Sequence, residues 1–116
     1  ERLLEMAESG KREYLDLPMQ AFAIGPELCI LLLPGEMFCE YQLHAEDVSP
    51  FAHTIVLGYI NFSVSYVGTK KDYELPGLTG GHGIAPHTNT PLDPSVEEMI
   101  NEGITQILTE LKTKCA

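Results

Sequence analysis

Residues 28–36 read LCILLLPGE, and this stretch decides the fold class. The apolar run from Leu28 to Leu33 predicts a strand buried on both faces of a sheet, as in a layered α/β domain. Pro34 has no N–H to donate and Gly35 tolerates unusual φ values, so the pair predicts a sharp turn. Glu36 is then expected at the carboxyl end of the strand, as the first residue of a helix.

The sequence on either side predicts the other elements. Residues 19–24 form a strand that the turn at 25–27 joins to the first strand as a hairpin. The helix after Glu36 ends at Ser49-Pro50 and has one face, which comprises Phe38, Tyr41, Gln42, Ala45 and Val48. Residues 53–60 predict a third strand, and residues 61–69 a short strand or a loop.

Helices are predicted at both ends of the chain. Residues 1–9 have helical spacing and Gly10 is placed to cap them. A long Gly- and Pro-rich loop spans residues 74–92, and Asp93 and Pro94 then have the chemistry of an N-cap and a first helical residue. One apolar stripe predicts that the last helix packs on a sheet; it comprises Val96, Met99, Ile100, Gly103, Ile104, Ile107, Leu108 and Leu111.

Composition excludes several classes of function. The net charge of −10 opposes binding to nucleic acid or to an anionic membrane, because both need clustered Lys and Arg. The longest apolar run is far shorter than the ~20 residues of a membrane span. Three cysteines without metal-finger spacing define no disulfide framework; Cys29 and Cys39 are predicted to be buried, and Cys115 to lie at a frayed end.

Two oxygen-bearing side chains are candidates for chemistry. Glu36 follows a buried strand at the end where ligands gather in open α/β sheets, although a helix dipole alone also favours a carboxylate there. Tyr66 follows the third strand, and a nearby divalent cation favours its phenolate; a half-buried structural tyrosine is the alternative. Asn61 begins a glycosylation sequon, but its apolar neighbours favour a buried or site-facing side chain.

The four histidines are weaker candidates. His44 is predicted at a surface or edge, and His53 in a hydrogen-bonding role at the start of a strand. His82 and His87 lie in the Gly-rich loop, and they would reach Glu36 only if that loop folded back. The chain has no P-loop, no GxGxxG, no GxSxG and no HExxH, so those enzyme classes lose support.

Two segments in a shared order resemble the neutral/alkaline ceramidase family and its uncharacterised bacterial members. The first contains LLLPGEMF, residues 31–38, like the strand–PGE–helix stretch of the family; the second runs from residue 49 to 69 and contains TIVLGYIN and YVGT. A downstream Asp72-Tyr73-Glu74 and the closing helix also match, and the resemblance covers roughly residues 18–111.

The resemblance implies that residues 1–116 are the C-terminal portion of one zinc-dependent amidohydrolase domain. In such enzymes two upstream histidines, a glutamate and a tyrosine hold one Zn²⁺, and metal-activated water attacks the N-acyl amide of a ceramide-like lipid. The glutamate falls on Glu36 and the tyrosine on Tyr66, which would ligate the metal or stabilise the oxyanion. Asn61 and His82 would lie behind these ligands or contact the substrate.

The departures from the family define the alternatives. The two histidine ligands have no counterpart here, and Gln42-Leu43-His44 stands where better-known ceramidases have Gly-Arg-Arg. The chain alone is therefore expected to bind zinc weakly or not at all, because catalytic zinc normally has three protein ligands. The alternatives are a catalytically idle α/β binding or assembly domain, and a hydrolase of another amide or ester. Self-association through exposed sheet faces is a further expectation. The resemblance allows a secreted or periplasmic protein, so the cellular compartment is not predicted.

Overall fold

A computed structural model describes residues 5, 8–10, 14–61, 66–75 and 92–115. Its main sheet has the strand order β1-β2-β4, formed by Gln20–Ile24, Leu28–Leu32 and His53–Leu57. β1 and β2 are the predicted antiparallel hairpin, and Gly25 at φ 66° accommodates its turn. β2 and β4 are parallel, and a parallel pair needs a crossover connection, which a helix provides here.

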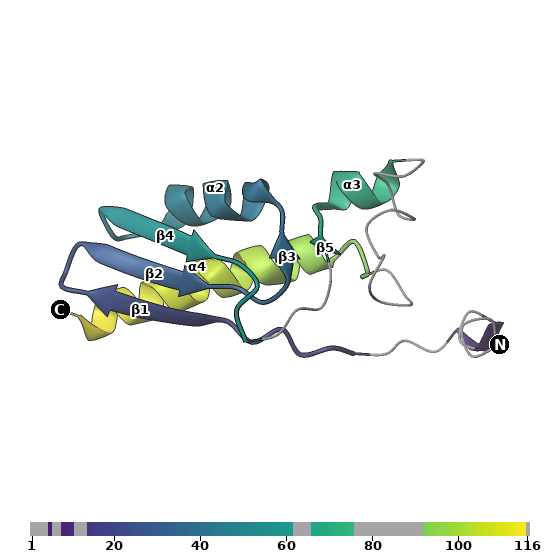
Figure 1. Ribbon diagram of the computed structural model, residues 1–116, viewed down its shortest axis with the longest axis horizontal. Coiled ribbons are helices and arrows are strands. Elements are labelled where there is room, and N and C mark those ends of the chain that lie inside the picture. The colour runs from purple at the N-terminus through teal and green to yellow at the C-terminus, as the bar shows by residue number, and fades with distance from the viewer. Residues whose placement is uncertain (1–4, 6–7, 11–13, 62–65, 76–91, 116) are drawn as a thin grey trace.

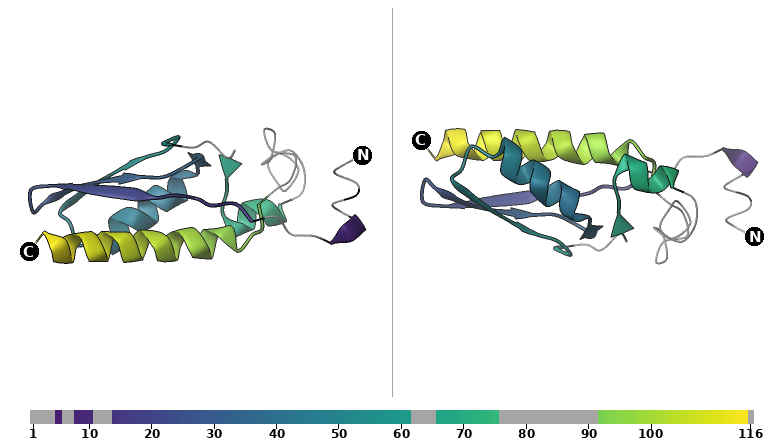
Figure 2. Two further views of the ribbon diagram at one scale, coloured as in Figure 1. Left: turned by 90° about the horizontal axis from the view of Figure 1, so that it is seen from below. Right: turned by 90° about the horizontal axis from the view of Figure 1, so that it is seen from above.

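Two helices cover one face of this sheet (Figures 1 and 2). α2, Cys39–Val48, connects β2 to β4 and packs on β4, whereas α4, Val96–Lys114, packs on β1 and on α2. The predicted α/β class, with a hairpin, a strand-turn-helix unit and a long C-terminal helix on the sheet, is confirmed. None of the described helices is both long enough and apolar enough to cross a membrane.

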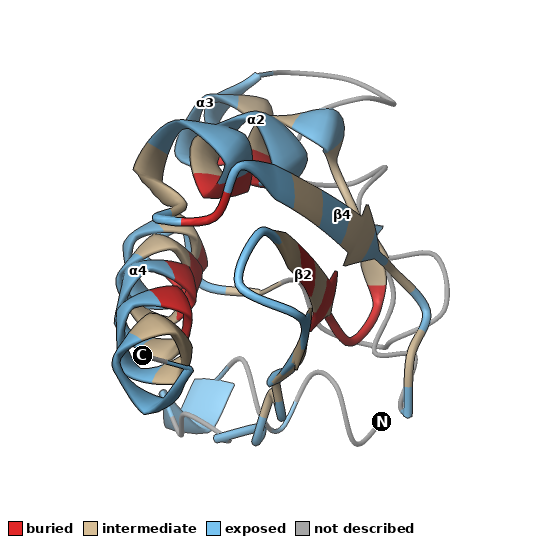
Figure 3. Ribbon diagram, turned by 90° about the vertical axis from the view of Figure 1, so that its left-hand side faces the viewer, coloured by how far each residue is buried: buried red, intermediate tan, exposed pale blue. Residues whose placement is uncertain are grey.

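The core lies between the sheet and the two helices, where the buried positions of α4 face β2 (Figure 3). The stripe on α4 follows from its 3.6-residue period, and residues outside the regular elements complete the core. Its buried members are Cys29, Leu31, Leu33, Tyr41, Ala45, Phe51, Val67, Val96, Ile100, Ile104 and Leu108. Lys112 joins the far end of α4 to the hairpin turn, because its Nζ donates to Pro26 O at 2.6 Å.

The opposite face of the sheet is apolar and is covered by none of the described residues. In the register, Phe22 lies beside Ile30 and Ile30 beside Ile55. Phe22, Ile24, Ile55 and Leu57 are between 42% and 58% exposed. The prediction that the strand at 28–33 is buried on both faces is therefore wrong for this part of the chain, since buried and half-buried residues alternate along β2.

Several predicted boundaries and burials are corrected. Glu36 does not begin a helix: Glu36–Met37 forms a two-residue strand, β3, before α2 starts at Cys39. Cys39 is exposed rather than buried, whereas Cys29 is buried as predicted. α4 begins at Val96, with Ser95 as its N-cap. The carboxylate of Asp93 caps the turn before the helix, because it accepts the N–H of Ser95 at 2.9 Å.

The two ends of the predicted long loop and the N-terminal segment are partly described. Lys70–Glu74 forms a short helix, α3, which the sequence did not predict. Residues 76–91, with His82 and His87, lie outside the described residues. Near the N-terminus Glu5, Glu8 and Ser9 are helical and Gly10 has φ 62°, in agreement with the predicted helix and its cap.

Candidate functional site

Glu36 and Tyr66, the two predicted site residues, are direct neighbours in the fold. β3 pairs in parallel with β5, Tyr66–Val67, and the register places Glu36 opposite Tyr66. Facing residues on adjacent strands project to the same side of a sheet. Phe38 N extends the pairing by donating to Val67 O at 3.1 Å. Glu36 and Tyr66 are 30 positions apart in the sequence (66 minus 36). They nevertheless present a carboxylate and a phenol on one surface of the sheet.

The site lies where two parallel strands end. β2 leads into Pro34-Gly35-Glu36, and its neighbour β4 leads into Gly58-Tyr59. The two exits are joined by backbone hydrogen bonds, of which Leu33 N to Leu57 O and Tyr59 N to Gly35 O both measure 2.9 Å. Gly35 has φ 82°, which glycine adopts without steric cost. This is the edge of an open α/β sheet at which ligands bind.

Tyr59 is a member of the site that sequence reasoning missed. Its phenol donates to Glu36 Oε2 at 3.1 Å, and this hydrogen bond raises the pKa of Tyr59 above its usual value. One signal was available in the sequence: Gly58-Tyr59 ends a strand predicted to lie in the same sheet as the strand before Glu36, so both exits were candidates for one edge.

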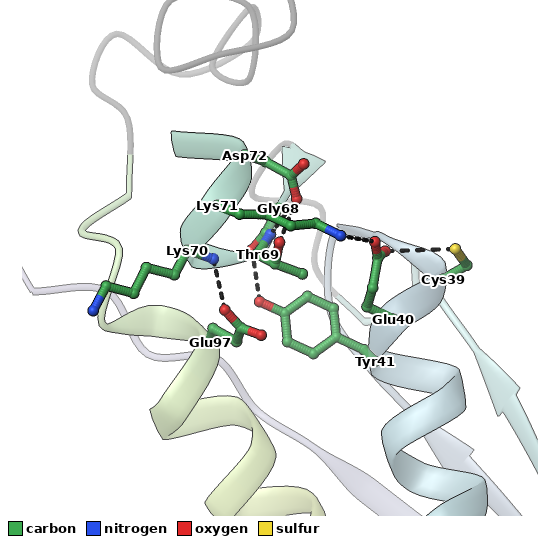
Figure 4. Close-up of polar contacts among 9 residues, drawn as sticks. All are labelled: Cys39, Glu40, Tyr41, Gly68, Thr69, Lys70, Lys71, Asp72 and Glu97. Carbon is green, nitrogen blue, oxygen red and sulfur yellow. Dashed lines mark hydrogen bonds and ion pairs between the residues drawn. The ribbon is translucent and has the colours of Figure 1, made fainter. Parts of the chain in front are cut away.

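A cluster of polar contacts connects the residues that follow β5 to α2 and α4 (Figure 4). The buried Tyr41 of α2 donates to Gly68 O at 2.7 Å, and burial raises the pKa of this phenol. Glu97 of α4 accepts the backbone N–H of Lys70 at 2.6 Å. Lys71 and Glu40 form an ion pair at 3.1 Å between α3 and α2. These contacts attach the residues directly after Tyr66 to both core helices.

Asp72 closes the N-terminus of α3. Its Oδ2 accepts both the backbone N–H of Thr69, at 2.8 Å, and the Thr69 hydroxyl, at 2.6 Å. Thr69 is buried, so neither donor has water as an easy replacement. The carboxylate therefore holds the chain in the turn that connects β5 to α3.

We expect Asp72→Ala to lower the free energy of unfolding by about 1–2 kcal/mol, because a cap is lost and buried donors become unpaired. Urea unfolding measures the change. Glu74→Ala, at the exposed C-terminal end of the same helix, is the matched control and should change stability by less than about 0.5 kcal/mol. Equal effects of the two substitutions would contradict the capping role.

The other predicted residues make contacts of their own. Asn61 is exposed rather than buried; its Nδ2 donates to Gln20 Oε1 at 2.7 Å, which ties the exit of β4 to the start of β1. His44 is half-buried between α2 and α4, with Nε2 3.2 Å from Asn101 O. The ring of His44 lines a groove along α4 whose lining includes neither Glu36 nor Tyr66. His53 makes a backbone hydrogen bond, from its N–H to Glu27 O at 2.9 Å.

Within the described ranges, no three His, Cys, Asp or Glu side chains are grouped closely enough to hold a metal ion. Glu36 and Tyr66 are thus a pair of oxygen donors rather than a complete centre. A metal centre that used both oxygens would need further ligands from outside the described residues. No family model, no curated protein and no solved structure matches this chain.

Proposed function

We propose that this chain supplies the glutamate and tyrosine of a zinc-dependent amidohydrolase centre that cleaves an N-acyl amide of a ceramide-like lipid. The observation that carries the proposal is the pairing of Glu36 with Tyr66 in the β3–β5 register, at the carboxyl ends of β2 and β4. The resemblance to neutral ceramidases selects these same two residues. Support from the residues and support from the fold therefore converge on one edge of the sheet.

Each residue has a distinct task in this proposal. Glu36 contributes a carboxylate oxygen to the metal, and Tyr66 contributes a phenol oxygen either to the metal or to the oxygen that becomes negative in the tetrahedral transition state. Bound zinc, for its part, makes its water acidic and polarises the substrate carbonyl. The backbone hydrogen bonds between the exits of β2 and β4 hold the main chain that carries the Glu36 carboxylate before the substrate arrives.

The centre needs histidine ligands in addition. The two that the resemblance implies match nothing in this sequence, and His82 and His87 lie outside the described residues. We therefore expect the 116-residue chain alone to bind zinc weakly and to hydrolyse no amide. Tight stoichiometric zinc binding by this chain would contradict that expectation and favour His82 or His87 as a ligand.

Glu36→Ala tests the proposal in the full-length protein that contains this chain. We expect the substitution to remove most of the bound zinc and to abolish hydrolysis of N-acylsphingosine, because a ligand to the metal is lost. Elemental analysis of the purified protein measures zinc content independently of activity. Glu102→Ala, an exposed glutamate of α4, is the matched control and should retain both. Full zinc occupancy in Glu36→Ala would exclude Glu36 as a ligand.

A second candidate function is a binding or assembly domain without catalysis. It is favoured by the exposed apolar face of the sheet, since large apolar patches mark interaction sites. Absence of zinc from the purified full-length protein, together with association that Phe22→Asp or Ile55→Asp abolishes, would favour it. A hydrolase acting on a different amide or ester would keep the metal and be found by a panel of substrates.

A further inference from the structure

We propose that Tyr59 is a positioning residue for the Glu36 carboxylate, which it holds in the orientation that a metal ligand requires. The inference rests on the proposed function and adds to it a residue that the ceramidase resemblance does not assign. Tyr59 touches neither the metal nor the substrate in this proposal. It acts through Glu36.

Tyr59 donates two hydrogen bonds to the Gly35-Glu36 segment. The backbone N–H of Tyr59 donates to Gly35 O at 2.9 Å, and its phenol donates to Glu36 Oε2 at 3.1 Å. The first bond fixes the peptide that precedes Glu36, and the second fixes the end of its side chain. Tyr59, at the exit of β4, is therefore hydrogen-bonded both to the backbone before the proposed ligand and to its carboxylate.

The backbone of Tyr59 indicates that this arrangement is maintained against a steric cost. Tyr59 has φ 59°, in the left-handed region that non-glycine residues with a large side chain rarely adopt. Tyr59 as a residue is 66% exposed, so burial of apolar surface gives little compensation. Residues held in such conformations are concentrated at functional sites. The contact that gives the Tyr59 side chain a role at this position is its hydrogen bond to Glu36.

The chemistry of the carboxylate is compatible with both partners. An ionised carboxylate has about four lone-pair positions, so it can accept a phenol hydrogen bond and still bind a cation. Metal-binding carboxylates are oriented by hydrogen bonds from residues that do not themselves contact the metal. Loss of such a bond typically weakens metal affinity by about 10–100-fold. Tyr59→Phe removes the hydroxyl alone and keeps the ring, so it isolates this contribution.

Cobalt(II), whose visible absorption reports on its coordination, is a suitable probe in the metal-free full-length protein. We expect Tyr59→Phe to raise the dissociation constant for cobalt by about 10-fold or more and to change the absorption bands. Tyr14→Phe is the matched control, because it deletes the hydroxyl of a tyrosine that is 94% exposed; it should leave the affinity and the spectrum unchanged.

Tyr59→Gly separates positioning from a merely structural role. Glycine adopts the same φ without steric cost, so the thermal midpoint of this variant should be at least as high as that of the original protein. Cobalt affinity should nevertheless fall at least as far as in Tyr59→Phe. A lower midpoint together with unchanged cobalt affinity would overturn the proposal, because it would show that Tyr59 serves the fold alone.

The same titration distinguishes failure of this inference from failure of the proposed function. If Glu36→Ala binds cobalt as the original protein does, then Glu36 is not a ligand and both proposals are wrong. If Glu36→Ala loses cobalt while Tyr59→Phe retains the original affinity and spectrum, only the positioning role is wrong. Loss in both variants, with Tyr14→Phe unaffected, supports it.

Discussion

Replacing Ile104 by alanine is expected to lower the free energy of unfolding by about 2–5 kcal/mol. Ile104 lies in the middle of α4 and is fully buried between that helix and the rest of the core. The substitution removes apolar contacts and leaves a cavity. The closely packed side chains around it can move into this cavity only in part. Since small domains are stable by about 5–15 kcal/mol, this one change can remove a large share of the total.

Met99→Ala on the same helix is the control for that prediction. The sequence places Met99 in the same apolar stripe, but the residue is 67% exposed, so we expect a change within about 0.5 kcal/mol. Urea unfolding followed by far-ultraviolet circular dichroism measures both variants. A similar loss of stability in the two would show that Met99 is buried in solution and that α4 packs with a different face.

Tyr41→Phe is expected to lower the free energy of unfolding by about 1–3 kcal/mol and to loosen the site. The substitution keeps the buried ring but removes the hydroxyl that donates to Gly68 O at 2.7 Å. Because Gly68 is buried, its carbonyl loses a partner that water does not readily replace. That carbonyl lies two residues after Tyr66, so the attachment of β5 to α2 weakens with it.

Two measurements check this prediction. Urea unfolding gives the loss of stability, and amide hydrogen exchange gives its location, which should be β5 and α3 rather than the β1–β2 hairpin. Tyr14→Phe, a hydroxyl deletion at an exposed position, should change neither. Faster exchange spread evenly over the whole chain would contradict a local role for Tyr41 in holding β5.

The elements that the sequence predicted correctly are those whose signals are local. The stripe and end residues of α4 lie within one continuous segment, and the hairpin is defined by two apolar runs around a Gly-Pro turn. The helix predicted to begin at Glu36 was placed three residues too early, because Glu36–Met37 pairs with a strand 30 positions away and α2 starts at Cys39. A two-residue strand has no periodicity from which it could be predicted.

The candidate site divides in the same way. Glu36 and Tyr66 were singled out from residue type, context and family resemblance, yet their spacing alone does not bring them together. Tyr59 was missed because its φ of 59° and its hydrogen bond to Glu36 arise only when β4 lies beside β2. Asn61, by contrast, was predicted to be buried or to face the site; burial is wrong, since the chain leaves the sheet after β4 and the residue is exposed.

The sequence by itself determined the α/β class, the hairpin, the amphipathic C-terminal helix and the oxygen-bearing residues at the ends of strands. Each of these follows from apolar periodicity or turn chemistry within a few neighbouring residues. Only the tertiary structure decided that Glu36 faces Tyr66, that the Tyr59 phenol donates a hydrogen bond to the Glu36 carboxylate, and that one apolar face of the sheet lies open. Those features depend on which strands pair and in which register, and pairing is set by packing between distant segments rather than by any local pattern.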